Sequence, residues 1–119
     1  IQLTGGEPML HKNFFEILEC SKANFRTTIT TNGTLIHADN AVHFRGVNAV
    51  QISLYSNIPH NHDSITGVNG SFHKTLNGIK MLTKENIYCL TAAMITRSNL
   101  VNIEDIIKFN EDLGVKAVR

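Results

Sequence analysis

The sequence contains no tryptophan and only two tyrosines, two prolines and two cysteines among its 119 residues. So few aromatic side chains do not provide the stacking platforms of single-strand nucleic-acid binders. A formal net charge of +1 provides no basic stripe for a phosphate backbone. No apolar run approaches the roughly 20 residues that a membrane-spanning helix needs. We therefore expect no nucleic-acid or membrane partner, and 42% hydrophobic residues are enough for the core of one domain.

The two cysteines, Cys20 and Cys89, are far apart and have no ligand motif beside them. A disulfide or a metal site would need a partner arrangement that the sequence does not contain. This pattern indicates free, partly buried thiols and a cytoplasmic protein.

Strand and helix patterns alternate along the chain. Apolar or β-branched runs predict strands at Ile1–Thr4, Arg26–Thr31, Ala49–Leu54, Ile87–Ile95 and Val115–Val118. Helices are predicted over 10–22, over 35–44, from an N-cap at Ser71, and from an N-cap at Asn102 to a stop at Gly114. This order predicts an α/β fold of five parallel strands and four helices. It fits either part of a (β/α) barrel or an open doubly wound sheet.

The predicted helices have apolar stripes at helical spacing. The stripes consist of Leu10, Phe14, Ile17 and Leu18, then Phe72, Leu76, Ile79 and Leu82, and then Ile103, Ile106, Ile107 and Leu113. The run Ile87–Ile95 is almost continuously apolar, which is typical of a strand buried on both faces. Residues 55–70, which connect the third strand to the third helix, are mostly polar.

Polar residues follow four of the predicted strands. These residues are 5–7, 30–33, 53–56 and 96–99. Because the carboxyl ends of parallel strands lie at one edge of a sheet or barrel, the four segments should meet there. This clustering predicts a ligand site at that edge.

The run Thr4-Gly5-Gly6-Glu7-Pro8 leads from the first strand to the first helix. Its two glycines allow a sharp turn with exposed carbonyl oxygens, because no Cβ blocks the approach of a ligand. Glu7 adds a carboxylate, and Pro8 fixes the exit of the turn. Such a turn suits a ligand ammonium group better than a phosphate.

Three further residues are candidates for ligand contacts. Strand alternation puts Thr30 and Asn32 on the face opposite Ile29 and Thr31, so we expect them at the barrel mouth. The alternative for Asn32 is a purely structural Asn-Gly turn. Ser53 is a candidate at the end of the third strand, and its alternative is a small side chain that fills the barrel interior.

Other polar residues favour structural interpretations. His62 and Asp63 could move protons, but loop-fixing hydrogen bonds by Asp63 and Thr66 agree better with adjacent side chains that point apart. A metal site at residues 60–62 would need a cysteine or carboxylate cluster that is not there. Arg97 could meet a carboxylate of a ligand, or it could be a solvated loop arginine.

Several motifs together resemble the radical S-adenosylmethionine (radical SAM) family. The run from Thr4 to Pro8 is similar to the family's GGEP motif, residues 30–33 to its third-strand ending, and residues 51–56 to its fourth strand. Residues 62–67 and 70–72 resemble the loop and helix start of members with a SPASM-type C-terminal extension. The resemblance covers most of the chain.

This resemblance implies a partial (β/α)₆ barrel and the reductive cleavage of SAM by a [4Fe–4S] cluster, which gives a 5′-deoxyadenosyl radical. The implied partners are an external electron donor and a peptide, protein or small-molecule substrate. The implied cofactor-binding residues are Gly5, Gly6, Glu7, Pro8, Thr30, Asn32 and Ser53. Of these, Gly5, Gly6 and Glu7 would hold the SAM amino group, and Ser53 its ribose or carboxylate.

The chain also departs from the family pattern. The cluster-binding CxxxCxxC motif, which lies upstream of GGEP in the family, does not occur in residues 1–119, and Tyr55 replaces a common acidic residue. We therefore expect a single segment of a radical SAM core domain that lacks the first βα unit and the last helix. By itself it should bind no cluster and cleave no SAM, and anaerobic reconstitution giving a stable brown protein would contradict this. An exposed edge strand should favour dimers, which light scattering can test.

Two other functions compete with the enzyme. One is a non-catalytic module that binds SAM or another amino-acid-like ligand at the same edge. The other is a small open-sheet interaction domain. Sequential strand order would exclude the open sheet, because a doubly wound sheet reverses its strand order.

Overall fold

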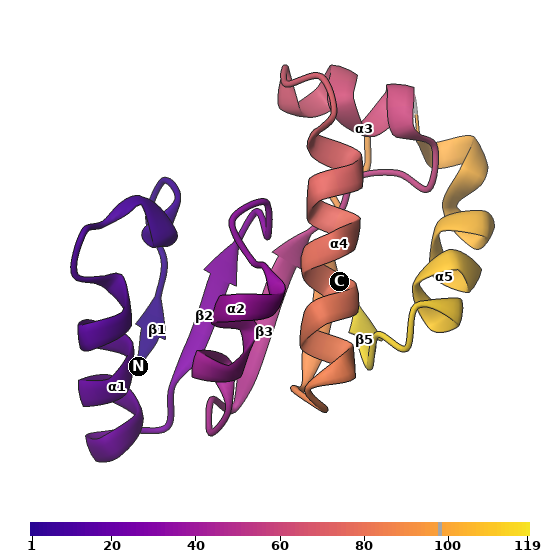
Figure 1. The fold of residues 1–119 in the computed structure, drawn as a ribbon. Helices are drawn as coiled ribbons and strands as arrows, with labels where there is room; N and C mark the ends of the chain where they lie inside the picture. Colours follow the sequence, from indigo (N-terminus) through magenta and orange to yellow (C-terminus); the bar gives the residue numbers. More distant parts are fainter. Residues whose placement is uncertain (98) are drawn as a thin grey trace.

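The computed structural model describes residues 1–97 and 99–119. The described residues form one sheet of five parallel strands in sequential order (Figure 1). The strands are β1 (Gln2–Leu3), β2 (Thr28–Thr31), β3 (Ala49–Ser53), β4 (Cys89–Ala92) and β5 (Ala117–Val118). This order excludes a doubly wound sheet, because that topology reverses direction. The prediction of an incomplete parallel (β/α) barrel is confirmed.

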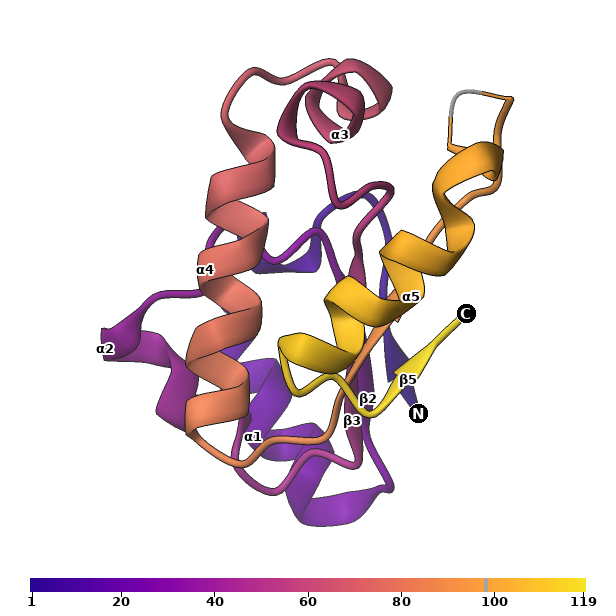
Figure 2. The same cartoon turned by 90° about the vertical axis from the view of Figure 1, so that its right-hand side faces the viewer.

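Five α-helices and three short 3₁₀ segments connect the strands in the described part of the chain. The α-helices are α1 (Phe14–Asn24), α2 (Ala38–Ala41), α3 (Pro59–Thr66), α4 (Ser71–Lys84) and α5 (Ile103–Asp112). The 3₁₀ segments are η1 (Pro8–Leu10), η2 (Val42–Phe44) and η3 (Leu100–Asn102). In both views α3 lies beyond the carboxyl ends of the strands (Figures 1 and 2). It therefore closes the end of the sheet where the ligand site is expected.

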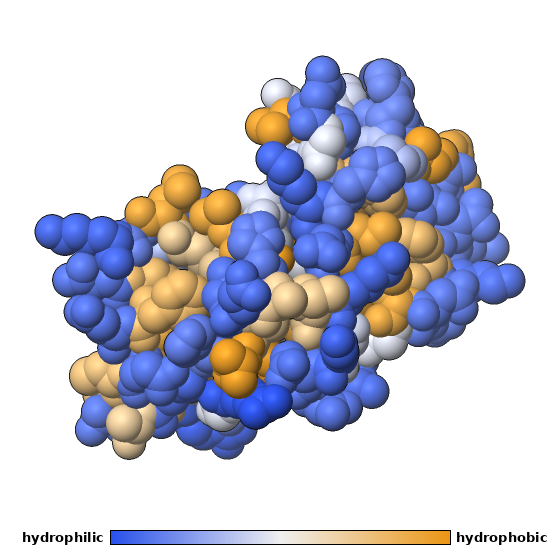
Figure 3. All heavy atoms as spheres, viewed as in Figure 1, coloured by the Kyte–Doolittle hydropathy of each residue, from blue (hydrophilic) through white to orange (hydrophobic). Residues whose placement is uncertain are grey.

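The core forms between the sheet and the apolar faces of its helices. Strand alternation buries Ile29 in β2 and Val50 and Ile52 in β3. From α4 the predicted stripe contributes Phe72, Ile79 and Leu82 as buried residues, with Leu76 half-buried. On the face seen in Figure 1, hydrophilic residues separate the exposed apolar ones into smaller groups (Figure 3).

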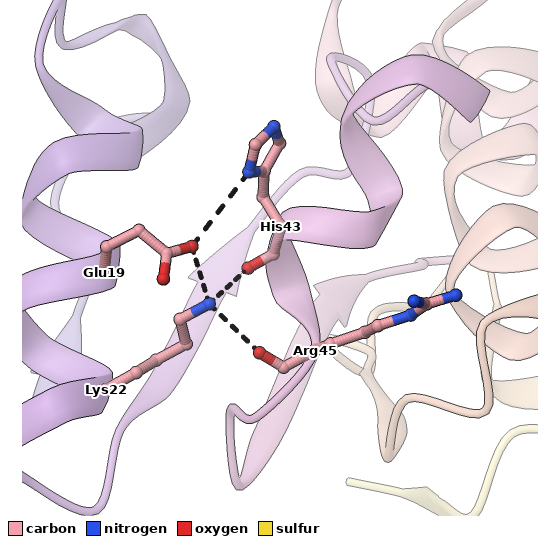
Figure 4. A network of polar contacts seen from close by, with 4 residues as sticks. All are labelled: Glu19, Lys22, His43 and Arg45. Carbon is pink, nitrogen blue, oxygen red and sulfur yellow. Dashed lines mark hydrogen bonds and ion pairs between the residues drawn. The ribbon is translucent and has the colours of Figure 1, made fainter.

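A polar network joins α1 to the segment before β3. The Nζ atom of Lys22 donates to Glu19 Oε1 (2.7 Å) and to the carbonyl oxygens of His43 (2.8 Å) and Arg45 (3.0 Å) (Figure 4). The Nδ1 atom of His43 lies 4.0 Å from the same Glu19 oxygen. All three ammonium hydrogens of Lys22 can be satisfied in this way. The network lies at the amino ends of the strands, away from the expected ligand site.

The first two helices are shorter than the sequence predicted. Leu10 belongs to η1 and is 74% exposed, because Pro8 starts a separate turn and α1 begins only at Phe14. The expected helix over 35–44 is divided into α2 and η2. The helix begins at Ala38 rather than at residue 35, because the Asn40 side chain bonds to the backbone of the residues before it. Asn40 accepts a hydrogen bond from the His37 N–H (2.8 Å) and donates one to the Leu35 carbonyl (2.9 Å).

Helix α3 occupies part of the polar segment 55–70, for which no helix was predicted. Its apolar face is minimal, so the periodicity of the sequence did not reveal it. Pro59 stands at the helix start, and Gly67 ends it with φ 72° in the left-handed region. A proline at the start and a glycine after the end are the sequence signal that could have predicted this helix.

The N-terminus of α4 is capped by a residue of the preceding helix. Gly70, with φ 79°, is the N-cap, so the prediction of Ser71 as the cap was wrong. Asp63 accepts hydrogen bonds from the N–H groups of Phe72 (2.8 Å) and Gly70 (2.6 Å) and from the Ser71 hydroxyl (2.9 Å). These bonds, the Phe72 N–H first, lower the pKa of the Asp63 carboxyl. Asp63 therefore fixes the α3–α4 connection, which agrees with the prediction of loop-fixing hydrogen bonds by this residue.

The C-terminal elements are less buried than predicted. Strand β4 ends at Ala92, and beyond it Met94 and Ile95 are exposed, so the expected strand Ile87–Ile95 was too long. In α5 only Ile106 of the predicted stripe is fully buried. Ile103 is at the exposed first turn, and Ile107 lies about 100° around the helix from Ile106. None of the helices in the described residues has the length and apolar character needed to cross a bilayer.

Candidate functional site

A cavity of about 530 Å³ lies at the carboxyl ends of β1, β2 and β3. This volume falls within the roughly 300–1,000 Å³ of small-molecule sites. The strand ends contribute Gly5, Gly6, Thr30, Thr31, Asn32, Thr34, Ser53 and Tyr55. The region from α3 to α4, with one residue after β4, contributes His62, Ile65, Thr66, Val68, Ser71, Thr75 and Met94.

Five of the seven candidate residues line this cavity: Gly5, Gly6, Thr30, Asn32 and Ser53. A Cβ atom added at Gly5 or Gly6 would meet no atom within 4 Å. The backbone of this turn is therefore open to the approach of a ligand. Gly5 has φ 146°, which side-chain-bearing residues rarely adopt, whereas Gly6 has no such restriction.

The other two candidates, Glu7 and Pro8, do not line the cavity. Glu7 Oε1 accepts hydrogen bonds from the Thr31 hydroxyl (2.7 Å) and the Met9 N–H (3.1 Å). Glu7 Oε2 accepts one from the Asn32 N–H (2.8 Å). The carboxylate therefore ties the glycine turn to the end of β2. Pro8 starts η1 and lines a separate hollow of about 240 Å³ beside β1 and α1.

Thr30 and Asn32 are both at the cavity and both hydrogen-bonded. The Thr30 hydroxyl accepts a hydrogen bond from Gln2 Nε2 (2.8 Å). Asn32 Oδ1 accepts from the backbone N–H (2.8 Å) and hydroxyl (2.7 Å) of Thr34. Asn32 thus forms the turn that was its structural alternative while it also lines the cavity. Because the turn uses only Oδ1, the Nδ2 group is the part of the Asn32 side chain that could contact a ligand.

Helix α4 approaches this turn closely. The Thr75 hydroxyl donates to the Asn32 carbonyl (2.9 Å). A Cβ atom at Gly78 would lie 2.3 Å from the Gly33 carbonyl oxygen, so only glycine permits this contact. Sequence reasoning missed both residues, and an isolated glycine inside a helical stripe is the signal that could have revealed Gly78.

His62 is a buried histidine in the wall of the cavity. It is 1% exposed, and its ring packs against Tyr55 and Phe72 at centroid distances of 5.7 and 5.8 Å. Its Nδ1 accepts a hydrogen bond from the Tyr55 N–H (3.3 Å), whereas Nε2 has no partner among the described residues. Burial lowers the pKa of His62, and the nearby Asp63 carboxylate only partly offsets this effect. His62 is therefore a neutral imidazole with its hydrogen on Nε2.

Acidification is expected to destabilise the fold through His62. Because its pKa is lower in the folded chain than in the unfolded chain, the unfolded chain binds a proton that the folded chain does not. This contribution to stability is complete above the unfolded pKa of 6.5. It is lost as the pH falls toward the folded pKa, by at most about 1.4 kcal/mol per pH unit. Urea denaturation between about pH 7.5 and 5.5 measures the slope, and His62→Gln should reduce it. Equal slopes for both proteins would contradict the assignment.

The thiols and Arg97 lie away from the cavity. Cys20 is exposed, contrary to the expectation of partial burial, because it lies on the outer side of α1. Cys89 is free and buried, and burial raises the pKa of its thiol to about 12. Arg97 is exposed and does not line the cavity. Of the predicted segment 96–99, Ser98 lies outside the described residues, and Asn99 is buried beside Tyr55.

The described residues fit one of the two implied cofactors. The Gly5-Gly6 turn lines the cavity and has open space beside both Cα atoms, so a ligand such as SAM can approach its backbone, and the cavity has a suitable size. Within residues 1–97 and 99–119, no group of three or more His, Cys, Asp or Glu side chains could hold a metal ion. These residues thus provide a SAM-sized cavity but no ligand set for an iron–sulfur cluster.

The fold and cavity define a class of protein: a parallel (β/α) barrel segment with a cavity of small-molecule size at the carboxyl ends of its strands. A sequence profile described as the Radical SAM superfamily matches residues 1–110. The chain belongs to the radical SAM superfamily.

Curated relatives support this assignment. The chain is 34% identical over 120 residues to the AdoMet-dependent heme synthase of Oleidesulfovibrio alaskensis. It is 35% identical over 121 residues to the subtilosin biosynthesis protein AlbA of Bacillus subtilis. Each match covers 98% of this chain but only 31% and 27% of the relative, respectively. The chain thus spans about a third or less of their length.

A solved protein structure has the same fold. Streptococcus suis SuiB, in structures with S-adenosylmethionine and with its precursor peptide SuiA, matches this chain with a TM-score of 0.84 at 19% identity. The matches cover 98% of this chain and 28% and 27% of SuiB. At this identity the likeness shows the fold alone.

Proposed function

We propose that this chain is the SAM-binding part of an enzyme that cleaves SAM reductively and starts radical chemistry on a peptide substrate. The observation that carries the proposal is the open Gly5-Gly6 turn at the edge of a cavity that is large enough for SAM. A [4Fe–4S] cluster, held by residues outside the described ones, would supply the electron for the cleavage. The protein binds and orients the cofactor and excludes water from it.

The proposal gives a role to Gly5, Gly6, Glu7 and Ser53. The carbonyl oxygens of Gly5 and Gly6 accept hydrogen bonds from the SAM ammonium group. Glu7 holds that turn against β2 through its bonds to Thr31 and Asn32 and does not contact the ligand. The Ser53 hydroxyl binds the ribose or the carboxylate. Hydrogen bonds to a charged group contribute about 1.5–3 kcal/mol each, so we expect the two bonds from the glycine turn to contribute much of the binding free energy.

The peptide substrate is supported by the relatives. AlbA is a bacteriocin biosynthesis protein, and SuiB was solved with a precursor peptide. The similarity to a heme synthase supports a second candidate, a small-molecule substrate. Incubation of the complete protein with SAM, reductant and either a precursor peptide or a tetrapyrrole separates the two, because mass spectrometry identifies which substrate changes mass.

Substitution of Gly6 by valine tests the site. Gly6 has space for a side chain and no restricted φ, so the fold should tolerate the change. The new side chain would occupy the place of the ammonium group and weaken SAM binding by roughly tenfold or more, the equivalent of one lost charged hydrogen bond. Anaerobic equilibrium dialysis with SAM and the melting temperature are the two measurements.

Thr4→Val is the matched control for Gly6→Val. Thr4 is exposed, precedes the same turn and does not line the cavity, so SAM binding should be unchanged. Unchanged SAM affinity in Gly6→Val would contradict the proposed site. SAM binding without formation of 5′-deoxyadenosine in the reconstituted complete protein would favour a non-catalytic binding module instead.

The proposal includes the partners and location of the protein. An external electron donor would reduce the cluster, and flavodoxin-type and chemical reductants can be compared in the same cleavage assay. The exposed thiol of Cys20 agrees with the cytoplasm. Strand β1 is an edge of the sheet and could pair with a second copy, for which sedimentation equilibrium is the test.

A further inference from the structure

Tyr55, at the carboxyl end of β3, is held from both sides by buried polar side chains. Its N–H donates to His62 Nδ1 (3.3 Å), and its carbonyl oxygen accepts from Asn99 Nδ2 (2.9 Å). His62 is 1% and Asn99 0% exposed. The N–H and the carbonyl group of Tyr55 are thus both hydrogen-bonded to side chains, which lie 7 and 44 positions further along the sequence.

Asn99 joins two sides of the cavity. Besides the Tyr55 carbonyl, Asn99 Nδ2 donates to the Met94 carbonyl (2.9 Å), and Oδ1 accepts from the Thr96 N–H (2.7 Å). Tyr55 and Met94 both line the cavity but follow different strands. A buried amide whose donors and acceptor are all used is a rigid connection, because each lost bond would leave a buried polar group unpaired.

The Tyr55 side chain is suited to contact a ligand. It is half-buried in the cavity wall, and its ring stacks at 30° on the imidazole of His62, which also lines the cavity. None of the described residues that line the cavity is an aspartate, glutamate, lysine or arginine. A cationic or flat ligand group would therefore meet hydroxyls, carbonyls and this aromatic ring. Aromatic rings attract cations and stack on flat rings.

We propose that the Tyr55 ring contacts the bound cofactor and that Asn99 is the positioning residue that holds it in place. The inference rests on the proposed function, in which SAM occupies the cavity. SAM has two groups that an aromatic ring can recognise, the positively charged sulfonium and the purine. S-adenosylhomocysteine retains the purine and has a neutral thioether, so a comparison of the two ligands distinguishes these groups.

The first experiment measures the binding of SAM and S-adenosylhomocysteine to the reconstituted complete protein without reductant, by equilibrium dialysis. Tyr55→Leu should bind SAM about 2- to 30-fold more weakly, the range expected for one cation–π or stacking contact. Tyr55→Phe, which keeps the ring, should bind like the wild type. A loss confined to SAM identifies the sulfonium, and an equal loss for both ligands identifies the purine. Wild-type affinity of Tyr55→Leu for both ligands would overturn the proposal.

The second experiment tests whether Asn99 acts through Tyr55. Asn99→Asp keeps the acceptor for the Thr96 N–H and loses both Nδ2 donors, and Asn99→Ala serves if a buried carboxylate prevents folding. Either variant should raise the KM for SAM with little change in kcat. In the Tyr55→Leu background the same change should have little further effect, because no ring is left to position. Additive losses would show a merely structural role for Asn99 and overturn that part of the proposal.

Asn102→Asp is the matched control, because the Asn102 side chain makes no capping hydrogen bond in the structure. Its SAM affinity should equal that of the wild type. The outcomes also separate the two proposals. Wild-type protein that binds neither ligand contradicts the proposed function and this inference together. Wild-type protein that binds SAM while the Tyr55 variants bind equally well contradicts only the inference.

Discussion

Glu7→Gln is expected to lower both the stability of the protein and its affinity for SAM. The substitution keeps the shape of the side chain but replaces one carboxylate oxygen by an amide nitrogen. That nitrogen would face either the Asn32 N–H or the donors of Thr31 and Met9, all of which need an acceptor. Hydrogen bonds to charged groups contribute about 1.5–3 kcal/mol, so the free energy of unfolding should fall by about that amount. Urea denaturation and SAM dialysis are the measurements.

A bracing role for Glu7 means that its carboxylate holds the glycine turn in place without contacting the ligand. Measuring stability and SAM affinity together distinguishes this role from direct ligand contact. If Glu7 braces the glycine turn, stability and affinity fall together. If instead Glu7 binds the ammonium group directly, Glu7→Gln would lose SAM affinity at wild-type stability, and the bracing role would be wrong. Glu16→Gln is the control, because Glu16 is an exposed glutamate in the first turn of α1. It should change the free energy of unfolding by less than about 0.5 kcal/mol.

Gly78→Ala should destabilise the protein, although alanine is the better helix residue. Inside an ordinary helix this change stabilises by roughly 0.5–1 kcal/mol. Here the new Cβ would lie 2.3 Å from the Gly33 carbonyl oxygen, so α4 or the turn after β2 must move. Overpacking of this kind costs about 1–3 kcal/mol, and thermal or urea unfolding measures it.

The turn displaced by Gly78→Ala includes Asn32 and Gly33, so SAM affinity should fall as well. Gly33 has φ 75°, and a Cβ atom built on it would lie 3.1 Å from the Ile52 side chain, so there is little space beside it for adjustment. Asn77→Ala, at the exposed neighbouring position of α4, is the matched control and should be neutral or slightly stabilising. A Gly78→Ala protein as stable as the wild type would contradict the close packing of α4 on this turn.

The layout of the sheet could be predicted from the sequence because it depends on local patterns. Alternation predicted that Ile29 and Thr31 share one face of the strand and Thr30 lies on the other, and in the structure Ile29 and Thr31 are the buried pair. The stripe of α4 was also predicted, because three of its four residues fill the core. Polar strand ends predicted the edge at which the cavity lies, and five of the seven candidate residues line it. These features follow from periodicity and parallel connectivity alone.

The contacts that shape the cavity could not be predicted, because they join residues distant in the sequence. The bond from Thr31 to Glu7 spans 24 positions, and the bond from Asn99 to Tyr55 spans 44. Helix α3 was missed because it has little apolar face, although it provides His62 and Thr66 to the cavity wall. Local sequence contains no information on which distant partner a side chain will meet.

The sequence by itself determined the order of the five strands, the glycine turn and the family, since each depends on neighbouring residues or short motifs. Only the tertiary structure decided that Glu7 bonds to the end of β2 and that Gly78 must remain without a side chain. It also decided that the backbone of Tyr55 is hydrogen-bonded to both His62 and Asn99. The physical reason is that hydrogen-bond partners and steric limits are fixed only when separate strands and helices pack together.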